Sequence, residues 1–221
     1  MTVELVPFAN TAVHYEALVN IENDIYPDWA RSAEEAELED RTIPAHMHLE
    51  RWLLRHVPSG EYIGYGGWGH TYWAYEPGLY FIGVYVLSAW QGQGHGRGLY
   101  NHLLPRILAR QPHTLRSETR SDSPRAIRFL TDRGFTLGLR EHISRLFLKE
   151  FDPTPYPAPT LPLYTLEHLA AHDPDYWHKR YELEIAVEQD IPWLNDFTPL
   201  PFEAWLAAEK SQQKTLPHLS Y

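Results

Sequence analysis

The sequence predicts an α+β fold in which helices flank a mixed central sheet, followed by the β-α-α opening of a partial second copy. Three observations lead to this expectation. The nearly continuous apolar run 79–87 precedes a glycine-rich turn and a helix, which is typical of a central strand buried on both faces. Up to residue 151, strand-like and helical segments follow in the order β-α-α-β-β-β-α-β-α-β. Residues 152–162 contain five prolines, as extended linkers do.

Spacing and end signals predict the elements of the first half. Residues 12–26 place apolar side chains at helical intervals, and Pro27 ends that helix. A serine followed by acidic residues predicts a second helix over 32–41. Residues 46–57 and 61–75 are rich in apolar and aromatic side chains and are separated by a Pro-Ser-Gly turn, which predicts two strands.

Helices and strands are also expected to alternate after residue 87. After the run 79–87, the glycine cluster opens a helix that we expect to reach about Ala109. A short strand is expected near 115–119, and a helix over 123–133 before a C-capping glycine. Residues 143–151, Ile-Ser-Arg-Leu-Phe-Leu-Lys-Glu-Phe, predict the closing strand of the sheet.

Three segments follow from this order: a complete domain at 1–151, a linker at 152–162 and a partial repeat at 163–221. Residues 181–191 align with 15–25, with five of eleven positions identical. We interpret the last segment as a strand and two helices that begin a second copy of the fold, with chance amphipathic similarity as the alternative. A segment this short buries little surface alone. It therefore needs either the first domain or another chain as a neighbour, so a homodimer is one expected arrangement.

Composition excludes several classes of protein. A hydrophobic content of 43% over 221 residues is enough for a sizeable core. The absence of cysteine excludes disulfides, thiolate metal sites and a cysteine nucleophile. The first residues lack the basic and apolar regions of a signal peptide, and no apolar run approaches the length of a membrane span. We therefore expect a cytoplasmic protein without a membrane partner.

Charge is distributed unevenly along the chain. The net charge of −10 argues against a nucleic-acid partner, which would need massed basic residues. Residues 1–96 carry 13 acidic and 4 basic side chains, whereas residues 97–149 carry 4 acidic and 11 basic ones. An acidic segment beside a basic one suits a site that holds a cationic substrate and an anionic cofactor. Solvated surface charge explains the same pattern.

The glycine cluster carries the most specific chemical signal. The strand ending at Val86 leads into Gln91-Gly92-Gln93-Gly94-His95-Gly96-Arg97, and glycines at a helix start let backbone amides approach phosphate closely. The dinucleotide pattern Gly-x-Gly-x-x-Gly does not fit, and no Gly-Lys-Ser/Thr follows as in Walker loops.

The pattern that does fit is Gln-x-x-Gly-x-Gly, and it resembles motif A of the GNAT acyl-CoA N-acyltransferases. A second motif, Ser123-Pro-Arg-Ala-Ile-Arg-Phe-Leu-Thr-Asp-Arg-Gly-Phe135, is similar to the family's Asn-x-x-Ala-x-x-x-Tyr-x-x-x-Gly-Phe helix. The resemblance covers about residues 3–150. It implies an acetyl-CoA-dependent N-acetyltransferase that moves an acetyl group to a primary amine by direct attack in a ternary complex. The acceptor would be a small-molecule or peptide amine.

The resemblance also implies which residues hold the cofactor. The backbone of one strand would pair with the pantetheine amides, the amides of the following loop would hold the pyrophosphate, and a serine would stand in place of a cofactor-contacting Asn. These residues are Val84, Tyr85, Val86, Gln91, Gly92, Gln93, Gly94, His95, Gly96, Arg97 and Ser123.

Catalytic residues are less well specified. Glu118 is the candidate general base, because some members carry a glutamate in the corresponding strand. We expect it to be partly desolvated, with Tyr72, Tyr80 or Tyr85 nearby; an ion pair with a neighbouring arginine is the alternative. Leu130 stands where many members have the Tyr that protonates the leaving thiolate. A non-catalytic CoA-binding or interaction module therefore remains the second hypothesis.

No metal site is expected. The 13 histidines form no His-Glu-x-x-His motif. His46, His48 and His70 are interpreted as surface or substrate-pocket residues.

Overall fold

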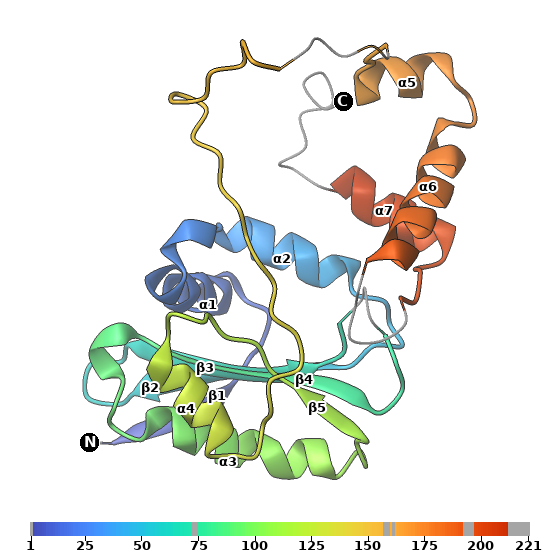
Figure 1. Cartoon of the computed structure of the whole chain (residues 1–221). Coiled ribbons are helices and arrows are strands. Elements are labelled where there is room, and N and C mark those ends of the chain that lie inside the picture. Colours follow the sequence, from blue (N-terminus) through green and yellow to red (C-terminus); the bar gives the residue numbers. More distant parts are fainter. Residues whose placement is uncertain (1, 72–74, 157–159, 161, 192–196, 212–221) are drawn as a thin grey trace. The chain divides into compact units, whose positions relative to one another are not determined.

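A five-stranded mixed sheet forms the centre of the fold (Figure 1). The computed structural model describes residues 2–71, 75–156, 160, 162–191 and 197–211. The first four strands are antiparallel neighbours, and the last pair is parallel. In spatial order the strands are β1 (Val3–Pro7), β2 (Leu49–His56), β3 (Tyr62–Gly69), β4 (Leu79–Val86) and β5 (Thr114–Arg116).

Helices cover both faces of this sheet, so the predicted α+β class is confirmed (Figure 1). One face carries α1 (Ala12–Ile25), the short η1 (Pro27–Trp29) and α2 (Ala33–Thr42). The other carries α3 (His95–Leu108) and α4 (Pro124–Thr131). The predicted start of α2 is confirmed in detail, because Ser32 and Glu35 form a reciprocal capping box.

The strand β4 packs on both faces, but only the α3 face is largely buried, whereas Phe81, Gly83 and Tyr85 on the α1 face are partly buried. Tyr80 and Ile82 pack in one cluster with Leu103 of α3. Tyr85 points the other way and packs against the cluster formed by α1 and Tyr65 of β3. The strand therefore separates two layers of core, and its C-terminal end leads into the glycine loop through η3 (Ser88–Trp90).

The prediction of a closing strand at 143–151 is wrong. No strand occurs between residues 117 and 156, all of which the structure describes. Ile143, Phe147 and Leu148 are 70%, 62% and 77% exposed. Apolar alternation stabilises a strand through pairing and burial rather than through the backbone itself, and this segment has neither. The strand expected over 61–75 also ends early, at Gly69.

The described part of the tail is helical. It contains α5 (Leu166–His172), α6 (Tyr176–Asp190) and α7 (Phe202–Ser211). The repeat's aligned residues thus lie largely in a helix, but the expected preceding strand is absent from the described residues after 162. The second copy and the linker boundary stay predictions, and linker residues 157–159 and 161 lie outside the described part.

The chain folds as two compact units, and the boundary between them follows Phe135 rather than lying in the proline-rich linker. One compact unit takes in Phe135 and the residues before it, together with α7, which contacts α2. The other unit includes α5 and α6. None of the helices that the structure describes has the length and apolar character needed to cross a membrane.

Candidate active site

The strands β4 and β5 leave an open edge beside the glycine loop. Their parallel pairing covers only Leu79 to Phe81 of β4. Beyond that point β4 continues to Val86 and pairs with β3 alone. The backbone of Val84, Tyr85 and Val86 therefore borders a gap in which an extended ligand can add as a strand would.

The glycine loop keeps its backbone accessible. Gly92 and Gly94 have φ values of +80° and +88°, a region that side-chain-bearing residues rarely adopt. Gly94 is the N-cap of α3 and has no side chain to bind the first helical amides. These N–H groups therefore remain for a ligand, and the helix dipole favours an anion there.

Two arginines flank this loop from different helices. A Cβ atom at Gly92 would lie 3.5 Å from Nη1 of Arg125, and one at Gly94 would lie 3.7 Å from Nη2 of Arg97. Both arginines are exposed, and within the described residues neither forms an ion pair or a hydrogen bond. Their charge is therefore available to a phosphate group beside the loop.

The other side chains of the motif hold the loop in place. Gln91 donates from Nε2 to the carbonyl oxygen of Val86 at 2.9 Å, which fixes the loop to β4. Gln93 donates to the carbonyl oxygen of Ala89 at 3.4 Å. The ring of His95 lies 6.0 Å from that of Trp90, and burial lowers the pKa of His95. The motif thus presents mainly backbone to a ligand.

A contact from α1 fixes the other side of the loop. The Ser88 amide donates to Oδ2 of Asp24 at 2.7 Å. The end of α1 is thereby held against the end of β4, which brings Tyr26 to Tyr85, with ring centroids 6.3 Å apart. Sequence reasoning missed Tyr26; its only signal is its position just before the helix-ending Pro27.

Glu118 lies near this contact but differs from the sequence expectation. The strand β5 ends at Arg116, and Glu118 follows it as an exposed residue rather than a partly desolvated one. Its charge acts on Tyr26 and Tyr85, so it faces the α1 side of the gap. Tyr80 packs on the opposite face of the sheet, and Tyr72 lies outside the described residues.

Tyr26 and Tyr85 lie on the α1 side of the gap, and Tyr65 of β3 is stacked behind Tyr85. The rings of Tyr85 and Tyr65 stack at 4.6 Å. Burial raises the pKa of Tyr85, and the nearby Tyr26 and Glu118 raise it further. Burial also raises the pKa of Tyr26, reinforced by the charge of Glu118 and opposed by Arg120. All three phenols are therefore protonated near neutral pH and can donate hydrogen bonds.

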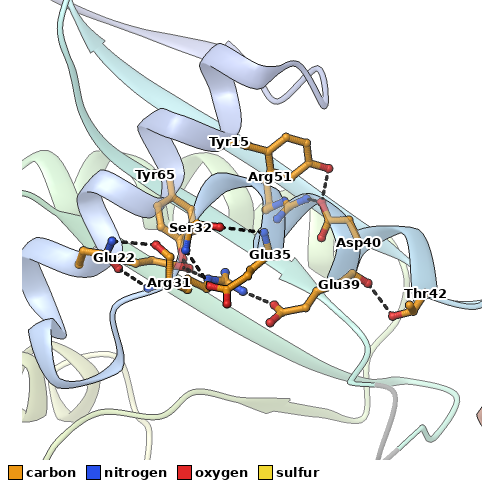
Figure 2. Close-up of polar contacts among 11 residues, drawn as sticks. Tyr15, Glu22, Arg31, Ser32, Glu35, Glu39, Asp40, Thr42, Arg51 and Tyr65 are labelled. Atoms are coloured by element: carbon orange, nitrogen blue, oxygen red, sulfur yellow. Dashed lines mark hydrogen bonds and ion pairs between the residues drawn. The ribbon is translucent and has the colours of Figure 1, made fainter. Parts of the chain in front are cut away.

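An ion-pair network fixes the tyrosine layer to α1 and α2 (Figure 2). The Tyr65 hydroxyl donates to Glu22, which accepts a second bond from Nε of Arg31 at 2.7 Å. Arg31 also pairs with Glu39 of α2. Because Tyr65 is buried and bonded at its tip, the stacked pair presents a rigid wall.

The start of α4 completes the cofactor side. Ser123 occupies the N-cap position of α4 but makes no side-chain capping bond. Its hydroxyl has no hydrogen-bond partner in the described part of the chain, so it can bind a ligand. Leu130 lies in α4 and offers no proton. Neighbouring Phe129 packs edge-on to Tyr100 at 6.0 Å.

His46, His48 and His70 lie at the opposite end of the sheet from the glycine loop. His48 donates from its amide to Nδ1 of His70 at 2.9 Å, where β3 ends and β4 begins. The described residues contain no group of three or more His, Asp or Glu that could hold a metal ion.

Fold and site geometry together define an acyl-CoA-type transferase, with a parallel pair whose hydrogen bonding stops at Phe81, before the strand reaches the glycine loop. The model of the Acetyltransferase (GNAT) family matches residues 15–135. Because this match spans more than half of the chain, the protein belongs to this family of N-acetyltransferases.

Solved structures share the fold at low identity. A transcriptional regulator from Bacillus halodurans is 22% identical over 66% of this chain and 100% of that one, with a TM-score of 0.50. An aminoglycoside 6'-N-acetyltransferase from Acinetobacter baumannii is 14% identical over 66% and 99%, with a TM-score of 0.49. An acetyltransferase from Trypanosoma brucei is 17% identical over 66% and 100%, with a TM-score of 0.47. No curated protein matches the chain.

Proposed function

We propose that the protein transfers the acetyl group of acetyl-CoA to a primary amine by direct attack within a ternary complex. The observation that carries this proposal is the open edge of β4 next to a loop with two left-handed glycines and two arginines that have no ion-pair partner among the described residues. An extended amide chain ending in a pyrophosphate matches this combination of an open strand edge and an anion site.

The cofactor would lie along β4 with its phosphates on the loop. The amides from Gly92 to Arg97 would bind the pyrophosphate, and Arg125 and Ser123 would contact it from α4. The pantetheine arm would pair with Val84 to Val86. The thioester would then reach the gap at Tyr85, where a strand amide can polarise its carbonyl.

The reaction requires two proton transfers. The acceptor ammonium must lose a proton before its nitrogen attacks the thioester carbon, and the C–S bond then breaks to release a thiolate. Glu118 is the proposed base. Because it is exposed, we expect it to act through a water. Tyr26 is the phenol that would give its proton to the thiolate, in the role that Leu130 cannot perform.

Release of free thiol tests the proposal. The protein is incubated with acetyl-CoA and a panel of primary amines, while CoA binding is followed separately by thermal shift, since a ligand of the native state raises Tm. Amine-dependent thiol release supports the transferase. A CoA-induced shift without turnover on any amine favours the non-catalytic CoA-binding module that Leu130 raises as the alternative.

The role of Tyr26 has its own test. Tyr26→Phe should lower kcat about tenfold and leave the KM for acetyl-CoA unchanged, because a thiol with a pKa of about 8.5 leaves slowly without an acid. Tyr62→Phe is the matched control, since that hydroxyl bonds His14 at 3.3 Å outside the site. Equal effects of both variants would exclude Tyr26 as the acid.

A further inference from the structure

The α1 face of the sheet carries a trough beside the proposed thioester position. Its volume is about 170 Å³. Tyr65 and Tyr85 form one end, Phe81 lies toward the other, and Arg51 of β2 forms a side. The floor lies between β3 and β4, where Gly67 pairs in register with Gly83. The sheet therefore carries no Cβ atom at this pair, and the side chains of Tyr85 and Arg51 lie over it.

The two floor glycines let neighbouring side chains lie close to the sheet. A Cβ atom at Gly83 would lie 2.5 Å from Cε2 of the Tyr85 ring, and one at Gly67 would lie 2.8 Å from Cγ of Arg51. The Tyr85 ring is stacked on Tyr65, and Arg51 is held by Asp40 and lies over Phe8 at 4.3 Å. A methyl group at either position would push the Tyr85 ring or the Arg51 side chain away from the sheet and so narrow the trough.

The lining favours an apolar guest. No Asp or Glu is among the described residues that line the trough. The one cationic side chain, Arg51, already pairs with Asp40 (Figure 2). An acceptor with several ammonium groups would leave charges there without partners, which is costly. A flat ring instead gains contact with the stacked tyrosines and with Phe81.

The size and place of the trough limit the guest further. A cavity of about 150 Å³ accommodates one benzene molecule, so this trough has room for one ring and a short chain. Its tyrosine end borders the open edge of β4, and Glu118 acts on Tyr85 at that end. A ring on the glycine floor would therefore direct a short alkylamine past Tyr85 toward the thioester.

Resting on the proposed transferase function, we propose that the acceptor is a primary amine joined by a short chain to a single aromatic or similarly compact apolar ring. Gly67 and Gly83 then determine specificity by letting Arg51 and Tyr85 lie close to the sheet, which leaves room above them for that ring.

Binding and turnover test this assignment separately. Saturation-transfer NMR on the full chain with CoA compares 2-phenylethylamine with spermidine, and thiol release with acetyl-CoA compares the same two amines. We expect ring-proton saturation for 2-phenylethylamine and a kcat/KM above that for spermidine. Gly83→Ala and Gly67→Ala should each raise the KM for 2-phenylethylamine about tenfold or more, because one methyl group in a fitted pocket has effects of that size.

Controls separate local from global effects. Gly98→Ala is the matched variant, because a Cβ there meets nothing within 4 Å, and it should leave that KM unchanged. A CoA-induced Tm shift equal to that of the wild type shows that the floor variants are folded.

Three outcomes decide between the claims. Preferential turnover of spermidine would overturn the acceptor class and leave the transferase intact. Absence of turnover with every amine, together with ring saturation that is lost in Gly83→Ala, would overturn the transferase and support the trough. Absence of ring saturation in the folded wild type would overturn the trough.

Discussion

The two halves of the site are built from different parts of the chain. On the cofactor side, the candidate site consists of backbone groups: an open strand edge, two glycines with positive φ and the free amides at the start of α3. On the acceptor side, the candidate site consists of side chains: a stacked tyrosine pair and an ion-pair network, which lie beside the trough. Changes of the loop glycines should therefore disrupt cofactor binding, whereas changes of acceptor-side groups should alter the chemistry and leave the cofactor bound.

The largest effect is expected at the glycine loop. Gly94→Glu forces a side chain into a left-handed backbone and puts negative charge where phosphate would bind, so it should abolish the CoA-induced Tm shift. Gly60→Glu is the matched control, because Gly60 also has a positive φ, +73°, but lies in the turn between β2 and β3. A full shift in Gly94→Glu would contradict the loop assignment.

The next effect separates chemistry from binding. Glu118→Gln keeps the shape and removes the base, so kcat should fall by about 10²–10⁴ with the affinity for CoA unchanged. Asp122→Asn removes an exposed charge from the same segment, where Asp122 pairs with Arg120 at 2.7 Å, and should retain activity. If Glu118→Gln loses CoA binding but keeps turnover at saturation, the base lies elsewhere.

A smaller effect is expected at the arginines beside the loop. Arg97→Gln and Arg125→Gln should each raise the Kd for CoA about threefold, with a weaker dependence of Kd on salt, because exposed charges contribute little individually. Arg128→Gln is the control from α4, since that side chain faces Asp132 at 3.8 Å. Calorimetric titration at two salt concentrations measures both quantities, and unchanged values would remove these arginines from the phosphate site.

The smallest effect concerns the pH dependence of stability. Burial, with the charge of His56, lowers the pKa of His95 in the folded state. The unfolded chain, with an ordinary pKa of about 6.5, therefore binds more protons as pH falls through and below that value, so acid reduces stability. His95→Gln should lose less Tm than the wild type between pH 7.5 and 5.5. An identical loss in both proteins would contradict the burial of this imidazole.

The sequence predicts the cofactor side of the site better than the acceptor side. Glycines with positive φ and a buried strand are local features, so the spacing of Gln91, Gly94 and Gly96 predicts the loop and, through the family resemblance, the fold. The tyrosine wall depends on α1 and β3 meeting across distant parts of the chain, and no local spacing encodes the pairing of Tyr65 with Glu22. The closing strand at 143–151 fails for a related reason, because its apolar pattern has no partner strand.

Hydrogen exchange of the full chain with and without CoA tests the central claim most directly. If the cofactor adds to the open edge of β4 and binds the glycine loop, peptides covering residues 82–97 should gain protection, while peptides from β1 and β2 should not change. CoA binding that leaves 82–97 unprotected, or that protects β1 and β2 instead, would contradict the account.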